Sequence, residues 1–254
     1  MPTDAFVEGD GFEYAACATE NTTGQLTWDA ARRLETFLRC DDRWRRRDGV
    51  VVEGRDGATA RRTTTRALEL GSGNGWLGMA LVRERERSGV GEMVMTERDR
   101  GGALEWLRRR VEVNAAWTRG GSGAIACKAL DWVEFARDEA EGGDDDGAFA
   151  GFDAIFGSDL VYDRDGIEAL PRVVAALLRR NPGAEFWYAH TKHRYDGMDE
   201  DFFAEIERCG LSREEVREDG VPTPPPSPPP FESLFPDQRI AVYRISLDAS
   251  ANQN

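Results

Sequence analysis

Long apolar runs are missing from this sequence. No segment approaches the ~18 consecutive apolar residues that a membrane-spanning helix needs. The opening residues MPTDAFVEGDGFEY lack the basic and apolar regions of a secretory signal. Only 40% of the residues are apolar, and the mean hydropathy is −0.56. We therefore expect a soluble globular protein that binds no membrane and acts in the cytoplasm, or also in the nucleus.

Cysteine and histidine are also scarce, and neither is arranged for metal binding. The cysteines lie far apart without a CxxC pair, at Cys17, Cys40, Cys127 and Cys209. This spacing argues for reduced thiols and against a zinc site. The two histidines, His190 and His193 in AHTKH, lack partner ligands. We expect no metal, and we expect these histidines to have solvated or packing roles near a substrate mouth.

Basic residues are outnumbered by acidic ones, which gives a formal net charge of −14. Because most of such a surface repels a phosphate backbone, we expect no nucleic-acid partner. Arginines nevertheless gather before the first core strand, at Arg43, Arg45, Arg46, Arg47, Arg55, Arg61 and Arg62. We interpret them as part of a solvated loop, with a docking patch for an acidic partner as the alternative.

The segment Arg66 to Gly78, RALELGSGNGWLG, has the pattern of a β-strand, a tight glycine turn and a helix that begins near Trp76. Glycine lacks a Cβ and tolerates positive φ, so a nucleotide-like ligand can lie against this backbone. The G-x-G-x-x-G spacing from Gly73 satisfies the dinucleotide pattern. The E-x-G-x-G-x-G order from Glu69 is that of Rossmann-like methyltransferases. The loop alone leaves a methyltransferase, a nucleotide oxidoreductase and an ordinary turn open.

Short apolar runs alternate with helical patterns along the rest of the chain. We expect strands at Ala67–Leu70, Glu92–Thr96, Ala124–Ala129, Phe152–Gly157, Glu185–His190, Leu211–Val216 and Arg239–Leu247. We expect helices at about Trp28–Arg39, Trp76–Arg85, Gly102–Ala116, Gly166–Arg179 and Glu200–Cys209. This alternation predicts an α/β fold with a doubly wound, mostly parallel sheet and helices on both faces.

The end of the chain departs from that alternation. No helix fits between the last two strands, where seven prolines stand among the nine residues Pro222–Pro230. We therefore expect these strands to pair as an antiparallel excursion at the sheet edge. A seven-stranded sheet with an antiparallel C-terminal strand is the methyltransferase variant, whereas the dehydrogenase sheet has six strands. The proline segment itself predicts a stiff hairpin loop, with docking to an SH3-like partner as the alternative.

Three regions follow from this pattern. Residues 1–64 should form an N-terminal arm, a helix capped by Thr27 and a charged loop at 41–64, all packed on the core. Residues 65–248 should form the sheet domain, and residues 249–254 a disordered tail. The acidic run Asp144–Asp146 within the sheet domain reads as a solvated loop tip, and recognition of a basic substrate tail is the alternative.

With the core in view, the chain resembles the seven-β-strand protein methyltransferases of the methyltransferase-like group, which modify mainly lysines of non-histone proteins. The similarity runs from about Gly24 to Cys209. The matching patterns are Gly24-x-x-x-Trp28 before a helix, ELGSGNGWLG, MTERD, Leu130-Asp131-Trp132 and the segment Gly157-Ser158-Asp159-Leu160-Val161-Tyr162. Glu97 stands where the family usually has aspartate, and Ser158 often reads alanine. Both departures are tolerable, because the carboxylate and the small side chain are kept.

The resemblance implies S-adenosylmethionine as the cofactor, across the carboxyl ends of the strands. It assigns cofactor binding to Trp28, Glu69, Gly71, Ser72, Gly73, Glu97, Asp131, Trp132 and Ser158. Glu97 would accept hydrogen bonds from both ribose hydroxyls, because an ionised carboxylate only accepts. Trp132 would stack on the adenine or pack in the core, and Asp131 would bind the adenine amine or turn the chain. Trp28 would cover the methionine end or pack in the core.

The resemblance also places Asp159 and Tyr162 at the reacting centre. A lysine must lose its proton before it attacks, which costs about 4–5 kcal/mol at pH 7. A carboxylate raises the pKa of a bound ammonium, so Asp159 would aim the incoming group and would not act as a strong base. Capping of the next turn is the alternative role. Tyr162 would frame the acceptor channel or pack under Asp159.

We therefore predict an S-adenosylmethionine-dependent methyltransferase that is a monomer and modifies a side chain, with lysine as the expected acceptor, of an unidentified non-histone protein. The alternatives are a small-molecule methyltransferase, an arginine or histidine methyltransferase, and a catalytically silent fold that serves as a binding module.

Overall fold

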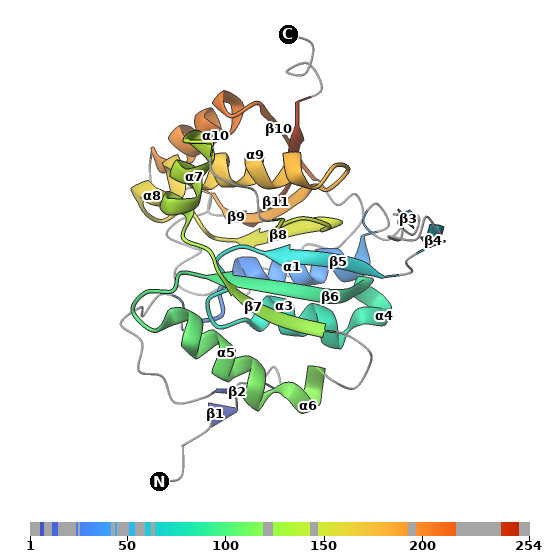
Figure 1. The fold of residues 1–254 in the computed structure, drawn as a ribbon. Coiled ribbons are helices and arrows are strands. Elements are labelled where there is room, and N and C mark those ends of the chain that lie inside the picture. Colours follow the sequence, from blue (N-terminus) through green and yellow to red (C-terminus); the bar gives the residue numbers. More distant parts are fainter. Residues whose placement is uncertain are drawn as a thin grey trace.

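The computed structural model has a seven-stranded sheet at its centre, with helices on both faces (Figure 1). It describes residues 6–7, 12–14, 24, 26–41, 44, 51–53, 59–61, 64–118, 124–142, 147–192, 197–216 and 240–248. Several expected features lie outside these residues, namely Cys17, most of the arginine cluster, Asp144–Asp146, His193, Pro222–Pro230 and the tail 249–254. No helix in the described ranges is long and apolar enough to span a membrane.

The strands of the sheet run in the order β10-β11-β9-β8-β5-β6-β7. Their bounds are β5 Thr65–Glu69, β6 Val90–Glu97, β7 Ala124–Ala129, β8 Ala154–Ser158, β9 Phe186–Thr191, β10 Leu211–Glu215 and β11 Ile240–Leu247. Within this sheet only β11 runs in the opposite direction to the other strands, and it pairs antiparallel with β9 on one side and β10 on the other. The predicted doubly wound sheet with an antiparallel C-terminal strand is confirmed.

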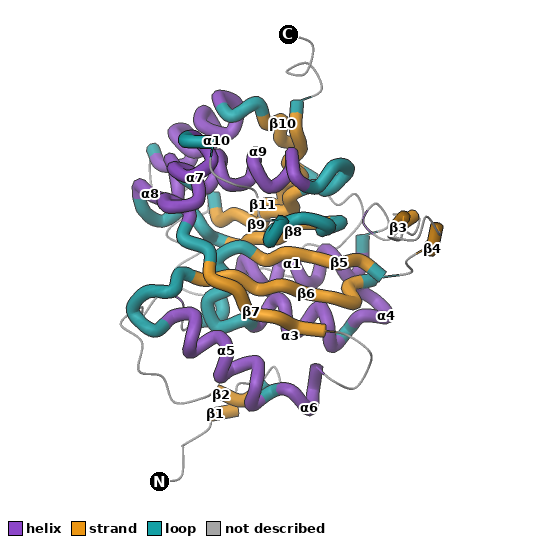
Figure 2. Tube along the Cα trace, viewed as in Figure 1, coloured by secondary structure: helices purple, strands orange, loops and turns teal. Residues whose placement is uncertain are grey.

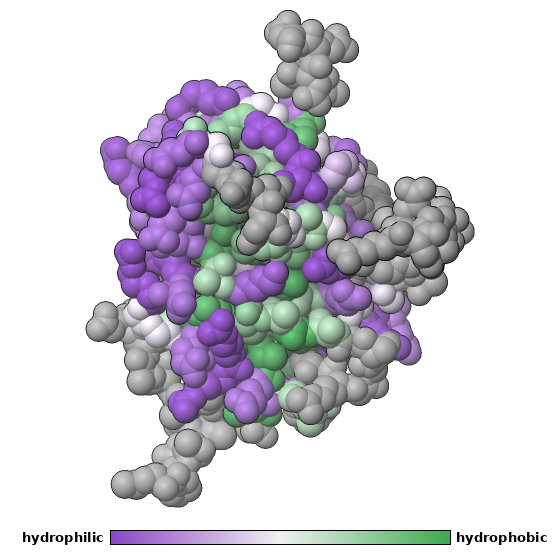
Figure 3. Space-filling model, viewed as in Figure 1, coloured by the Kyte–Doolittle hydropathy of each residue, from purple (hydrophilic) through white to green (hydrophobic). Residues whose placement is uncertain are grey.

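Helices cover the sheet in two layers, each with its own apolar cluster (Figure 2). One layer holds α1 Asp29–Cys40, α3 Trp76–Arg83 and α5 Ala103–Val113. The other holds α7 Trp132–Ala140, α8 Arg164–Glu168, α9 Leu170–Arg180 and α10 Met198–Arg208. Because both faces are covered, the central strands β8 and β9 are buried along almost their whole length. In Figure 3 hydrophilic residues gather over α7, α8 and α10, and a hydrophobic band crosses the strands below them.

Short elements complete the described chain. They are α4 Arg85–Ser88, α6 Ala115–Thr118 and the two-stranded pairs β1 Phe6–Val7 with β2 Glu13–Tyr14 and β3 Val51–Glu53 with β4 Thr59–Arg61. The expectation of a loop over residues 41–64 is therefore wrong in part. Valines at 51 and 52 favour a strand despite the surrounding charge. Trp44 in the same segment is buried, and its Nε1 donates to the Ser88 carbonyl at 2.7 Å.

Two helix predictions also need correction. The expected helices did not include α7, although Trp132, Phe135 and Ala136 recur at helical spacing and pack against the core while partly exposed. The helix expected over Gly166–Arg179 is two helices, α8 and α9, which meet at Ala169. Pro171 at the start of α9 lacks an N–H, so it suits a helix start and not a helix interior.

Candidate active site

A cavity of about 410 Å³ opens at the carboxyl ends of β5, β6 and β8. Every residue assigned above to cofactor binding or catalysis lines it: Trp28, Glu69, Gly71, Ser72, Gly73, Glu97, Asp131, Trp132, Ser158, Asp159 and Tyr162. These residues come from segments far apart in the sequence. The sheet topology brings them together, because the ends of neighbouring parallel strands meet at one edge.

The glycine loop forms one wall of this cavity and requires glycine at two positions. Gly71 has a φ of +56°, and a Cβ there would lie 2.8 Å from Leu160 Cδ2 and 3.2 Å from Trp132 Cζ2. Gly73 has a φ of +53°, and a Cβ would lie 3.0 Å from the Gly24 carbonyl oxygen. Side chains at these two positions would collide with their protein neighbours and strain the backbone, whereas the glycines leave the main chain open to the cavity that they line. The loop thus fits a ligand that lies directly against the main chain.

Glu97 ends β6 beside this loop. Its Oε1 accepts from the Gly73 N–H at 2.9 Å, and its Oε2 accepts from the Arg98 N–H at 3.0 Å. Burial raises the pKa of this carboxyl, and the two N–H groups oppose the shift. A carboxylate oxygen has a second lone pair, so the same group can still accept from ribose hydroxyls. Its position therefore fits the predicted ribose contact.

Glu69 ends β5 at the base of the cavity and is almost fully buried. Among the described residues, no hydrogen-bond partner of normal geometry reaches its Oε2. Desolvation raises the pKa of Glu69 to about 8, with the Ser72 hydroxyl and the Gly78 N–H opposing the shift and Glu97 adding to it. An unsatisfied buried carboxyl oxygen is costly unless a ligand or proton compensates it. This is a polar group for which a cofactor can supply a partner.

Asn74 is a site residue that the sequence interpretation missed. Its Nδ2 donates to Thr27 Oγ1 at 2.8 Å, and its Oδ1 accepts from the Trp76 N–H at 3.0 Å. The buried Arg110 donates through Nε to the Asn74 carbonyl at 3.0 Å. Asn74 therefore fixes the glycine loop to the start of α3 and to the N-terminal segment. An asparagine between two glycines of a turn is the sequence signal that could have indicated this side-chain contact with the N–H two residues on.

The same contact corrects the expected role of Thr27. The N-cap of α1 is Trp28, and no side-chain capping hydrogen bond is present there. Thr27 instead links to Asn74 through its hydroxyl. Trp28 is half-buried and lines the cavity, and its contact with the methionine end of the cofactor stays a prediction.

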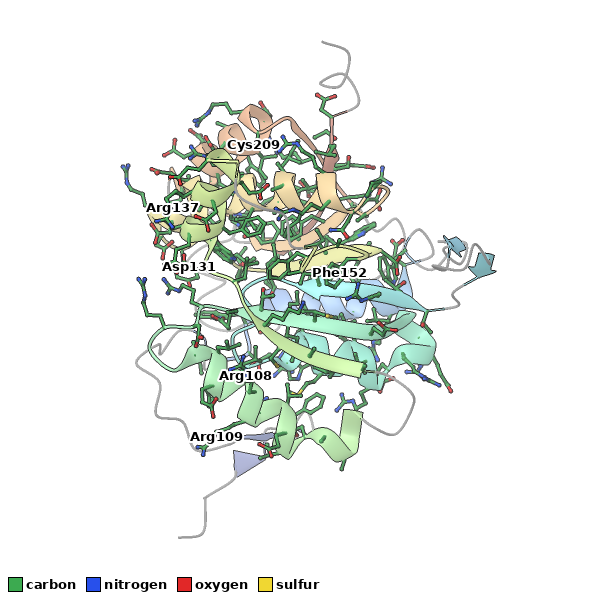
Figure 4. All side chains as sticks on the ribbon, in the orientation of Figure 1. Arg108, Arg109, Asp131, Arg137, Phe152 and Cys209 are labelled. Carbon is green, nitrogen blue, oxygen red and sulfur yellow. The ribbon has the colours of Figure 1, made fainter. Side chains whose placement is uncertain are left out.

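Asp131 and Trp132 begin α7. The Asp131 Oδ1 accepts from the Val133 N–H at 3.0 Å and the Glu134 N–H at 3.3 Å, so this residue caps the helix. Trp132 is half-buried against the Gly71 backbone. Figure 4 shows Asp131 and Arg137 on the same side of the molecule, at the start and in the body of α7. Of the two roles considered for Asp131, chain turning is the one seen here, and its contact with adenine stays a prediction.

Asp159 directly follows β8 and has a φ of +48°, alone among the described non-glycine residues in lying at positive φ. Its side chain points to the end of β9. The Oδ1 accepts from the Thr191 N–H at 2.8 Å, and the Oδ2 accepts from the Thr191 hydroxyl at 2.8 Å. Positive φ is uncommon outside glycine, although aspartate tolerates it better than most residues, and such conformations cluster at functional sites.

A buried hydrogen-bonded chain supports the turn that follows Asp159. The Leu160 N–H donates to the Tyr188 hydroxyl at 3.2 Å. The same hydroxyl lies 3.2 Å from His190 Nδ1. His190 Nε2 lies 2.9 Å from Asp199 Oδ1. Because a carboxylate only accepts, Nε2 carries a hydrogen, and in the neutral ring Nδ1 accepts from Tyr188. His190 is thus a buried packing residue, and it does not face the substrate mouth.

The chain is similar to known proteins in sequence and in fold. A family model described as lysine methyltransferase matches residues 15–209. No curated protein matches the sequence. Solved structures with a similar fold include a methyltransferase from Pyrococcus furiosus, at 13% identity over 86% of this chain and 99% of that chain, with a TM-score of 0.45. The METTL16 methyltransferase domain covers 86% of this chain and 80% of that chain, at 10% identity and a TM-score of 0.45.

The mitomycin 7-O-methyltransferase MmcR is similar at 13% identity, with a TM-score of 0.45. That match covers 72% of this chain and 49% of MmcR, so the chain spans about half the length of that enzyme. Likenesses at 10–13% identity concern the fold alone. The family model is different, because it spans well over half of the sequence and includes the glycine loop, Glu97 and Asp159. The chain therefore belongs to the lysine methyltransferase family, whose members use S-adenosylmethionine as cofactor.

Proposed function

We propose that this protein transfers a methyl group from S-adenosylmethionine to the side-chain amine of a lysine in another protein. The observation that carries this proposal is the Asp159 carboxylate, which lines the cofactor cavity and is oriented at both oxygens by Thr191. An oriented carboxylate beside the reacting centre suits a cationic acceptor, because it binds an ammonium through charge and hydrogen bonds.

The residues of the chain would divide the work as follows. The glycine loop and Glu97 hold the adenosine part, and Trp132 lies where it can stack on a base. When bound, the cofactor supplies a methyl group on a sulfonium, which leaves as a neutral thioether. Asp159 binds the incoming ammonium and aims its nitrogen, and the proton is lost to water before attack. Positioning accounts for much of the rate of such an in-line displacement.

The test is transfer of labelled methyl from S-adenosylmethionine into host-cell extract by wild-type protein and by Asp159→Asn. The substitution keeps the side-chain shape and removes the charge. We expect labelled protein bands with wild type, methyllysine at the labelled sites by mass spectrometry, and a loss of about 100-fold or more in rate with the variant. Cofactor affinity, measured by calorimetry, should stay within about twofold, because Asp159 acts on the acceptor.

Other outcomes would point to the alternatives. Label in methylarginine or methylhistidine would replace lysine as the acceptor. Label only in small molecules would show a small-molecule methyltransferase. Equal losses of rate and of cofactor affinity in Asp159→Asn would overturn the acceptor-aiming role of Asp159.

A further inference from the structure

Exposed apolar side chains gather at the mouth of the active-site cavity. Four large apolar side chains are exposed in the described part of the chain: Leu26 at 61%, Val113 at 45%, Val133 at 49% and Tyr162 at 38%. Three of them, all except Val113, line this one cavity. Single exposed apolar residues are ordinary, but several at one mouth mark an interaction surface.

These three residues come from three separate parts of the fold. Leu26 precedes α1, Val133 lies in the first turn of α7, and Tyr162 follows β8. Each of these side chains lies outside both apolar clusters of the core. We name Leu26, Val133 and Tyr162 together the apolar rim.

Acidic residues accompany the apolar rim on the β8–α8 segment. Asp159, Asp163 and Asp165 all line the cavity. No lysine or arginine in the described part of the chain lies within ion-pair distance of Asp163 or Asp165. Of the three arginines that line the cavity, Arg98, Arg100 and Arg137, two lie beside carboxylates, with Arg100 3.9 Å from Glu134 and Arg137 3.1 Å from Asp138. The Asp163 and Asp165 carboxylates at the mouth therefore have no cationic partner among the described residues.

We propose that the apolar rim with Asp163 and Asp165 is the docking surface for a basic polypeptide segment, in which the acceptor lysine stands near a large apolar residue and a second lysine or arginine. The apolar neighbour packs on the rim, and the second cation faces the carboxylates of Asp165 and of Asp163, which also caps α8 by accepting from the Gly166 N–H at 2.9 Å. The net charge of −14 favours approach of such a segment over an acidic one. This proposal rests on the proposed function, since it specifies the substrate class of the same site.

The chain offers matched controls for each part of the surface. Val133→Ser removes a rim side chain, and Val113→Ser removes an equally exposed valine on α5 that does not line the cavity. Asp165→Asn removes a charge from the first turn of α8, and Asp201→Asn does the same in the first turn of α10, away from the cavity. All four variants keep polar or small side chains at exposed positions, so folding should be retained.

The experiment incubates wild type and the four variants with host-cell extract and labelled S-adenosylmethionine, then maps methyllysine sites by mass spectrometry. We expect the sites to be enriched in large apolar and basic residues near the lysine, relative to unmodified lysines of the same proteins. Val133→Ser and Asp165→Asn should each lower the methylation rate by about fivefold or more, whereas the two control variants match wild type. Cofactor affinity should be the same in all five proteins.

The outcomes separate this inference from the proposed function. Methylated lysines without any enrichment of neighbours, or rim variants that behave like their controls, would overturn the docking surface and leave lysine methylation standing. Absence of methyllysine from every protein, despite cofactor binding, would overturn the proposed function and this inference with it.

Discussion

The two oxygens of the Asp159 carboxylate accept hydrogen bonds from a single residue, Thr191, one from its N–H and one from its hydroxyl, each at 2.8 Å. The parallel pairing of β8 with β9 creates this contact, because it brings the carboxyl ends of the two strands to the same edge. The Asp159 N–H also donates to the Ala189 carbonyl at 2.9 Å. The carboxylate is thus held in one orientation by the neighbouring strand.

Substitution of Thr191 should separate orientation from charge. Thr191→Val has nearly the same shape and keeps the N–H, but it lacks the hydroxyl that donates to Oδ2. We expect kcat to fall by about tenfold, because one fixing hydrogen bond is lost while the carboxylate remains. Cofactor affinity should change by less than about twofold. Initial rates of methylation of an acceptor protein would measure kcat, and calorimetric titration would measure cofactor affinity.

Thr191→Ser is the matched control, because serine retains the hydroxyl and should keep most of the wild-type rate. If valine were tolerated as well as serine, orientation of Asp159 by the hydroxyl would have no part in the reaction.

The Tyr188 hydroxyl should matter for stability as well as for the site. It accepts from the Leu160 N–H and contacts His190, and the ring is fully buried. Burial raises the pKa of this hydroxyl, with the Asp159 charge adding to the shift, so it stays protonated. Tyr188→Phe would leave the buried Leu160 N–H without this acceptor, at a cost of about 1–3 kcal/mol in the free energy of unfolding.

Urea denaturation with an unchanged m-value would measure that cost. The methylation rate should fall with it, since Leu160 directly follows Asp159, whereas cofactor affinity should be retained. A variant as stable and as active as wild type would show that the hydrogen-bonded chain is not needed to hold this turn.

The raised pKa of the buried Glu69 predicts that the free energy of unfolding depends on pH. The pKa in the folded protein is about 8 against an ordinary value of 4.5, mainly through desolvation. Between these two values the folded protein keeps the proton and the unfolded chain has released it, so the free energy of unfolding falls as pH rises. The fall is at most about 1.4 kcal/mol per pH unit, and it levels off above the folded pKa.

Glu69→Gln mimics the protonated carboxyl and should remove this contribution. The difference in unfolding free energy between wild type and variant, measured by denaturation from pH 5 to 9, isolates Glu69 from Glu97 and Glu35, whose pKa values burial also raises. We expect the free energy of unfolding of the variant to rise relative to that of wild type as the pH increases towards 8. A constant difference across that range would contradict the assigned protonation.

The sequence indicated much of the site because its signals are local. The glycine loop, Glu97 and the segment Ser158–Tyr162 each stand at a strand end, and strand ends converge in a parallel sheet. Thr191 could not be predicted, because its contact with Asp159 spans 32 residues and depends on the pairing of β8 with β9. The helix α7 was missed although the Asp131 cap is a local signal for its start, because none of its residues belongs to the fully buried core.

Substitution of Gly71 tests whether the open main chain of the glycine loop is needed for cofactor binding or only for the turn. In Gly71→Ala the new Cβ would meet Leu160 at 2.8 Å and Trp132 at 3.2 Å, at a φ of +56°. The variant should lose about 1–2 kcal/mol of stability from backbone strain and bind S-adenosylmethionine at least about 100-fold more weakly, because the methyl group displaces Leu160 and Trp132, which line the cavity.

Gly89→Ala is the control that separates these two effects. Gly89 also has positive φ, at +73°, but a Cβ there has nothing within 4 Å. It should therefore show the strain in thermal denaturation and keep wild-type cofactor affinity in calorimetry. If both variants lost stability equally and both still bound the cofactor, the close approach of ligand to backbone at Gly71 would be wrong. Loss of binding only in Gly71→Ala would show that the packing of Leu160 and Trp132 against Gly71 is needed for cofactor binding, beyond the positive φ of the turn.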